Sequence, residues 1–150
     1  MCEMLANHHF MIRNYLDATI TFEKVIAKGG ASKSIRKKII ICYVILFQIE
    51  KAIHEFLSLI QEDITFITDT NLQDEDCPCP ELISEIEINK INFSDKEKKM
   101  ALGILWLYCD LDTSLRYFEE YHKEYGQNIK INEIISIIKT FKNQIIQEKQ

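Results

Sequence analysis

The chain has 150 residues, of which 47% are hydrophobic and 27% are charged, and its net charge is −5. This length suits one domain with its own core, or three to four copies of a small repeat. Four glycines and two prolines are too few for the many tight turns of an all-β fold, and the acidic balance argues against a general nucleic-acid binder.

Two helices are predicted in the N-terminal part of the chain, and their pattern returns with a period of 34. In the segment NYLDATITFEKVI, Ala18 and Phe22 lie one helical turn apart. In the segment QIEKAIHEFLSLI, Ala52 and Phe56 have the same spacing, and the segments that precede the two pairs align as well. A fixed period of this length is typical of helical repeat proteins.

A third copy of the pattern occurs in the segment DLDTSLRYFEEYH, where Ser114 and Phe118 follow the second copy at an offset of 62. Its first helix is predicted in EKKMALGILWLYC. Since 62 is one period of 34 plus 28, the intervening stretch is either a shortened, degenerate repeat or an insertion. The whole chain is predicted to be a single domain, 1–150, with repeats at about 1–32, 33–66 and 95–128 and an irregular acidic insertion at about 67–94.

The small-then-aromatic pair has a physical reason. A small residue in the second helix lets the first helix approach closely, and the aromatic side chain one turn later fills the space against the neighbouring hairpin. One hairpin cannot bury its apolar face alone, so stacked copies build the core. We therefore expect an all-α fold of stacked antiparallel hairpins with about seven helices.

These features resemble the tetratricopeptide repeat, in which the 34-residue period, the small-then-aromatic pair and a tyrosine such as Tyr43 recur. The resemblance covers about two thirds of the chain and implies a superhelix whose first helices line a concave groove. Ala6, Ile40 and Leu102 replace the family's usual glycine in the first helix, and the usual closing proline is absent. A generic helical bundle with alanine and phenylalanine at helical spacing is the alternative.

The C-terminal segment NEIISIIKTFKNQIIQ has isoleucine and phenylalanine spaced along one helical face. We expect a capping helix at about 131–148, because a repeat array needs a cover over its exposed end. A helix lying on a membrane surface would need a more basic polar face.

Nine acidic residues lie between positions 61 and 89 with no lysine or arginine among them. We interpret this stretch as a solvated acidic loop, in which Pro80 begins the helix PELISEI. The segment DTNLQDEDCP superficially resembles a calcium loop, but it lacks the glycine of the sharp turn and the distant glutamate.

The sequence Cys77–Pro78–Cys79 in this loop supplies the only candidates for a metal or redox site. Structural zinc usually takes two pairs of ligands, and the chain has no second pair of this kind. The acidic neighbours would also raise the pKa of these thiols, which disfavours a reactive thiolate. We therefore predict no metal and no cofactor.

Lysines open the second and third hairpins, and the resemblance places the first helices along the concave face. Lysine and asparagine side chains in that groove resemble the clamp with which some family members hold acidic peptide tails. The alternative for the lysines is a solvated basic face. The alternative for Trp106, the one tryptophan, is a position in the core. The predicted partner-binding groove comprises Asn7, Met11, Lys37, Lys38, Ile41, Ile45, Lys99, Gly103 and Trp106.

The longest apolar stretch, IIICYVILF, is too short to span a bilayer, and the N-terminal residues lack the pattern of a secretory signal. The five cysteines are odd in number and lie mostly in apolar surroundings, which is typical of reduced thiols. We therefore expect a cytoplasmic protein that does not associate with membranes.

No catalytic triad, cysteine–histidine pair or phosphate-binding loop is visible, so we predict no enzyme. We expect a non-enzymatic interaction module that holds a protein or peptide partner in the concave groove, an acidic segment being one candidate. The uncapped first hairpin would also allow a homodimer. Two alternatives stay open: a small secretion or assembly chaperone of the same repeat type, and a metal- or redox-responsive regulator that uses Cys77 and Cys79.

Overall fold

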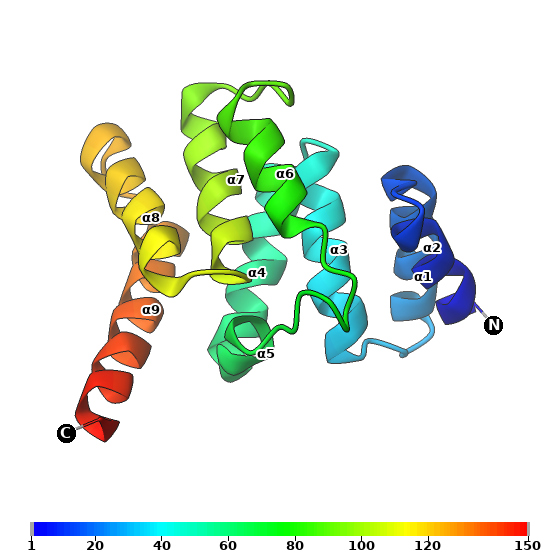
Figure 1. Ribbon diagram of the computed structural model, residues 1–150, viewed down its shortest axis with the longest axis horizontal. Helices are drawn as coiled ribbons and strands as arrows, with labels where there is room; N and C mark the ends of the chain where they lie inside the picture. The colour runs from blue at the N-terminus through cyan, green and yellow to red at the C-terminus, as the bar shows by residue number, and fades with distance from the viewer. Residues whose placement is uncertain (1, 150) are drawn as a thin grey trace. The chain divides into compact units, whose positions relative to one another are not determined.

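The computed structural model describes residues 2–149, and all their regular structure is helical (Figure 1), which confirms the all-α prediction. Residues 1 and 150, which belong to the predicted domain, lie outside the described part. Nine helices occur within it, more than the predicted number, because two short helices occupy the acidic stretch. The helices are α1 (Cys2–Met11), α2 (Tyr15–Ala27), α3 (Lys33–Ile45), α4 (Ile49–Asp63), α5 (Thr65–Thr68), α6 (Cys79–Glu87), α7 (Asp95–Leu107), α8 (Leu111–Tyr125) and α9 (Ile129–Glu148).

The helix bounds repeat with the spacings found in the sequence. The helix α2 starts at Tyr15 and α4 starts at Ile49, which is one repeat period later. The helices α3 and α7 have the same length, and so do α4 and α8. In both pairs the second helix starts 62 residues after the first, which is the offset between the second and third copies of the pattern. The internal repeat is therefore a property of the helices themselves.

The turns after α1 and α3 also repeat. At Arg13 and Phe47, one repeat period apart, the backbone enters the left-handed region with φ of 65° and 61°. In each turn the amide of the next residue donates a hydrogen bond of 2.8 Å to the carbonyl oxygen five positions earlier. Glycine is the usual residue at the left-handed position of this helix-ending pattern, and here Arg13 and Phe47 adopt it instead.

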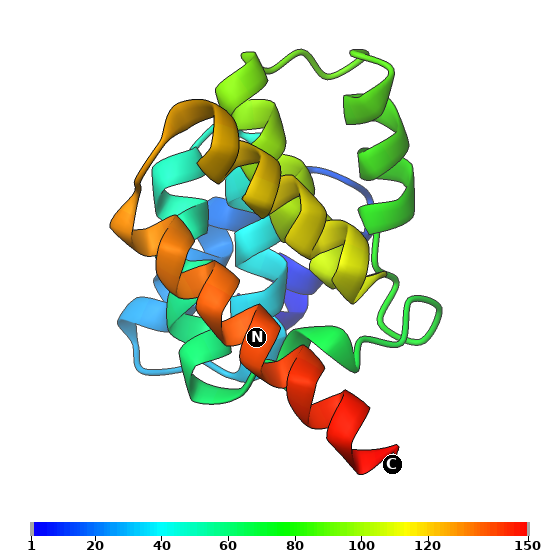
Figure 2. The same ribbon diagram turned by 90° about the vertical axis from the view of Figure 1, so that its left-hand side faces the viewer.

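The chain divides into two compact units, and the boundary between them lies between Phe56 and Leu57. In the first unit α1 packs on α2 and α2 on α3, and in the second α6 packs on α7, α7 on α8 and α8 on α9. Figure 2 shows the α8–α9 pair from the side. The adjacent pairing is compatible with a helical repeat, while the single domain and the superhelical stack stay predictions.

The small-then-aromatic pairs lie in the cores of these units, as their predicted role requires. Ala18, Ala52 and Ser114 are fully buried, and so are the three phenylalanines that follow them by one turn. In the third pair the Ser114 hydroxyl donates a hydrogen bond of 2.6 Å to the carbonyl oxygen of Gly103 on α7. The small residue therefore brings two helix backbones close together.

The helix predicted at PELISEI is confirmed, because α6 spans Cys79–Glu87 with Pro80 in its first turn, so this part of the predicted irregular insertion is regular. Leu82, Ile83 and Ile86 form one buried face of this helix, which packs against α7. The predicted cap also exists as a helix, since α9 packs on α8 and buries Ile131 and Ile138. Within residues 2–149 no helix combines the length and the apolar character that crossing a membrane requires.

Ser32 and Ser94, which precede the second and third hairpins, begin α3 and α7 in the same way. Each hydroxyl oxygen accepts a hydrogen bond of 3.3 Å from the amide three positions later. We expect Ser32→Ala or Ser94→Ala to lower the free energy of unfolding by about 1 kcal/mol, because that amide loses its acceptor. Urea unfolding followed by circular dichroism measures this. Ser34→Ala inside α3 is the control, and an equal effect at Ser34 would contradict the capping role.

Candidate functional site: a groove between α8 and α9

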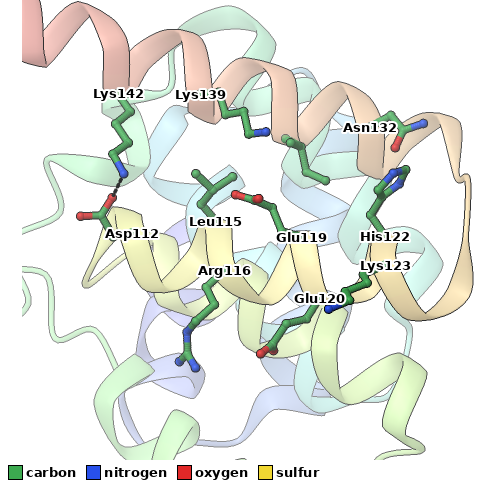
Figure 3. Close-up of a pocket in the computed structure, with 11 residues that line it drawn as sticks. Asp112, Leu115, Arg116, Glu119, Glu120, His122, Lys123, Asn132, Lys139 and Lys142 are labelled. Carbon is green, nitrogen blue, oxygen red and sulfur yellow. Dashed lines mark ion pairs between the residues drawn. The ribbon is translucent and has the colours of Figure 1, made fainter.

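An open groove of about 610 Å³ runs between α8 and α9 (Figure 3). The two helices run antiparallel, because Gly126 at φ 79° ends α8 and the side chain of Asn128 caps α9 by accepting a hydrogen bond from the Ile131 amide. Residues spaced by three or four positions on each helix share one edge and line the groove. The lining residues are Asp112, Leu115, Arg116, Glu119, Glu120, His122, Lys123, Asn132, Ile135, Lys139 and Lys142.

One ion pair closes an end of the groove. Lys142 of α9 lies 2.7 Å from the carboxylate of Asp112, at the start of α8. The hydrogen bond to Asp112 raises the pKa of the Lys142 ammonium group. Because both groups are solvated, this pair contributes little to stability.

The apolar part of the groove is small, and the charges along it are mixed. Leu115 is buried and Ile135 is half-buried, so together they offer an apolar floor. The lining contains four lysine or arginine side chains and three carboxylates, which makes it slightly basic in a chain of net charge −5. In Figure 3 the side chains of Lys139 and Glu119 extend into the space between the two helices.

Two lysines of the groove are available to a ligand. Lys123 and Lys139 are exposed, and among the described residues neither forms an ion pair. An exposed ammonium group beside an apolar floor can hold a carboxylate while an apolar side chain of the same ligand covers the floor. The arrangement therefore suits a segment in which acidic and apolar residues alternate along a helix.

A second, smaller pocket of about 210 Å³ lies where α7 begins, and Lys99 of the predicted groove is part of its lining. The Lys99 ammonium group lies 3.8 Å from Asp95 and 3.5 Å from Glu124, and its side chain is 15% exposed. The Tyr125 hydroxyl donates a hydrogen bond to Asp95, which lowers the pKa of that carboxyl group. Lys99 is thus already neutralised by carboxylates of its own unit.

The predicted groove residues of the first unit are mostly engaged within it. Lys38 donates a hydrogen bond of 2.9 Å to the side-chain oxygen of Asn7, which joins α3 to α1. Lys37 and Ile41 are buried, with exposed fractions of 6% and 2%. Among these residues, only Met11 is strongly exposed, while Ile45 is half-buried.

The remaining predicted residues lie on α7, in the second unit. Gly103 is covered by the ring of Phe118, and a Cβ atom added to it would lie 2.8–2.9 Å from three atoms of that ring. Trp106 is half-buried, and its indole nitrogen is buried with no hydrogen-bond partner within the described residues. Because the predicted residues belong to two separate units, their forming one concave groove stays a prediction.

The two cysteines of the acidic loop differ in accessibility, since Cys79 is fully buried and Cys77 is half-buried. Burial, followed by the influence of Cys77, raises the pKa of the Cys109 thiol to about 11. A thiol with such a pKa is a poor nucleophile at neutral pH. Within residues 2–149, no group of three or more histidine, cysteine or acidic side chains could hold a metal ion.

The α8–α9 groove was not predicted from the sequence, because the C-terminal helix was expected only to cap the array. A signal was present: Asn132, Ile135, Lys139 and Lys142 are spaced by three, four and three positions, which places them along one edge of a helix.

Comparison with models of known protein families, with curated proteins and with solved structures gives no match to this chain.

Proposed function

We propose that the protein is a non-enzymatic interaction module, built from tetratricopeptide-like helical hairpins, that binds an acidic segment of a partner protein in the α8–α9 groove. The supporting observation is that the exposed Lys123 and Lys139 line the same groove as Leu115 and Ile135. A cytoplasmic location belongs to the same proposal.

The two parts of the groove would contribute differently to binding. Burying one aliphatic side chain of the ligand on the floor is worth about 1.5–3 kcal/mol. An exposed ion pair at Lys123 or Lys139 is worth only about 0.2–1 kcal/mol, and it is weakened by salt. Apolar anchors therefore set most of the affinity, and the lysines select the sign of the ligand's charge and speed its association.

The α8–α9 groove is a better candidate binding site than the predicted concave groove. Lys37 and Ile41 are buried, and Lys38 and Lys99 already have partners in their own units. A segment bound there would have to displace these contacts. In the α8–α9 groove the ligand meets Lys123 and Lys139, which form no ion pair within the described residues.

An array of helical peptides tests the proposal. One set carries leucine at helical spacing with aspartate and glutamate between, and a matched set carries lysine at the acidic positions. We expect the wild-type protein to retain the acidic set, with binding at least about twofold weaker when salt rises from about 50 to about 500 mM. Equal retention of the lysine set would contradict the proposal.

A further inference from the structure

The helices α8 and α9 pack antiparallel, and two observations fix which of their residues face each other. The turn that joins them is centred on Gln127, between Gly126 at the end of α8 and Asn128 at the cap of α9. Asp112 and Lys142, which form the ion pair, lie fifteen positions before and fifteen positions after Gln127. Residues at equal distances from Gln127 in the sequence therefore lie at the same level along the groove.

Between the ion pair and the turn, the residues that line the groove form three levels. In order toward the turn, the facing pairs are Lys139 with Leu115, Ile135 with Glu119, and Asn132 with His122. The labelled side chains follow this order in Figure 3. We call the three positions the lysine level, the glutamate level and the turn level.

The turn level offers several hydrogen-bond donors to an anion. His122 and Lys123 are exposed there, and Asn132 is half-buried. In Figure 3 the ring of His122 extends from α8 toward Asn132 of α9. Ammonium, amide and imidazole N–H groups all donate to a carboxylate. Since Lys139 is exposed at the lysine level, each of these two levels can hold one carboxylate.

The glutamate level between them repels a carboxylate. Glu119 is exposed and forms no ion pair within the described residues, and its side chain extends into the space between the two helices (Figure 3). In that view the side chains of Arg116 and Glu120 point away from α9. Ile135, which is half-buried at the same level, offers an apolar contact instead. This level therefore favours an apolar side chain of the ligand over an acidic one.

The three levels correspond to fixed positions on a helical ligand that lies along the groove. Lys139 and Asn132 are seven positions apart on α9, which is about 10.5 Å at a rise of about 1.5 Å per residue. Two ligand residues seven positions apart span the same distance, and they lie on the same face of their helix. The residue four positions from the lysine level faces Glu119.

We propose that the α8–α9 groove selects its ligand by spacing: it binds a partner helix with two acidic residues seven positions apart and an apolar residue between them on the same face. The two carboxylates bind at the lysine level and the turn level. The apolar side chain lies against Ile135, where Glu119 excludes a third carboxylate. This inference rests on the proposed function, and it adds the residue pattern that the partner segment carries.

Three helical peptides, titrated into the full chain by fluorescence anisotropy, test the spacing. All three carry leucine at position i+3 and glutamate or glutamine at i, i+4 and i+7. The spaced peptide has glutamate at i and i+7, the close peptide has glutamate at i and i+4, and the neutral peptide has glutamine at all three. We expect the wild type to bind the spaced peptide at least about threefold more tightly than the close peptide, although the two have the same composition and charge.

The variant Glu119→Gln tests the cause of this preference. It removes the repulsion at the glutamate level, so the close peptide should gain affinity and the preference for the spaced peptide should fall below about twofold. The control Glu120→Gln removes the same charge from the neighbouring position, whose side chain points away from α9, and should keep the preference of the wild type.

Equal binding of the spaced and close peptides to the wild type would overturn the inference. So would a preference that Glu119→Gln leaves unchanged, or one that Glu120→Gln abolishes equally. In these cases the proposed function stands as long as both acidic peptides bind more tightly than the neutral peptide. A neutral peptide that binds as tightly as the spaced peptide would instead refute the proposed function, and this inference with it.

Discussion

Replacing Phe22, Phe56 or Phe118 by alanine is expected to lower the free energy of unfolding by about 3–5 kcal/mol. Each ring is fully buried and lies in the second helix of a hairpin, one turn after a buried small residue. Removal of the ring loses its burial and leaves a cavity that the two packed helices cannot fill, because the backbone approach is already close. Urea unfolding followed by circular dichroism gives the loss for each variant.

The control for these variants is Ile88→Ala, since Ile88 is 70% exposed. We expect this substitution to change the free energy of unfolding by less than about 0.5 kcal/mol. The repeat interpretation requires that all three phenylalanines behave alike. A loss below about 1 kcal/mol at any of them would show that its hairpin does not depend on the aromatic residue.

Gly103→Ala is expected to destabilise the protein by about 1–2 kcal/mol, although the same change stabilises an ordinary exposed helix by about 1 kcal/mol. The sign reverses because the added methyl group would lie within 2.9 Å of the Phe118 ring. That ring is fully buried and cannot move aside without disturbing its own neighbours. Thermal and urea unfolding of the single variant measure the effect.

The double variant Gly103→Ala/Phe118→Leu tests the cause. A smaller side chain at position 118 makes room for the methyl group, so the two changes should cost less together than the sum of their separate effects, by about 0.5–3 kcal/mol. Additive losses would show that the methyl group does not meet the ring. A Gly103→Ala variant more stable than the wild type would likewise refute the close contact of α7 and α8.

The helical hairpins could be predicted from the sequence because their signals are local and repeat. Ala18 with Phe22 and Ala52 with Phe56 carry the same spacing twice, and the offset between them recurs in the helix bounds. The prediction for α7 was less accurate. The resemblance placed Leu102 at the family's usual glycine position and Gly103 in the binding groove, whereas Gly103 lies against the second helix.

The binding surface could not be predicted in the same way, because it depends on which charges find partners. Lys99 is neutralised by Glu124 near the far end of the next helix, and that pairing follows from the antiparallel packing of α7 and α8. Lys123 and Lys139 lie in equally ordinary sequence surroundings, yet among the described residues they form no ion pair. Burial of Lys37 likewise depends on contacts that spacing alone does not reveal.

A charge-swap titration tests the proposed groove most directly. An acidic peptide retained in the array, and its lysine-substituted counterpart, are titrated calorimetrically into the wild type and into the variants Lys123→Glu/Lys139→Glu and Lys130→Glu/Lys149→Glu. The second variant changes two exposed lysines of the C-terminal segment that do not line the groove.

We expect the acidic peptide to bind Lys123→Glu/Lys139→Glu at least about tenfold more weakly than the wild type, and to bind Lys130→Glu/Lys149→Glu nearly as well as the wild type. The lysine-substituted peptide should bind Lys123→Glu/Lys139→Glu better than it binds the wild type. Equal weakening by both variants, or no gain for the lysine-substituted peptide, would contradict recognition of an acidic segment in the α8–α9 groove.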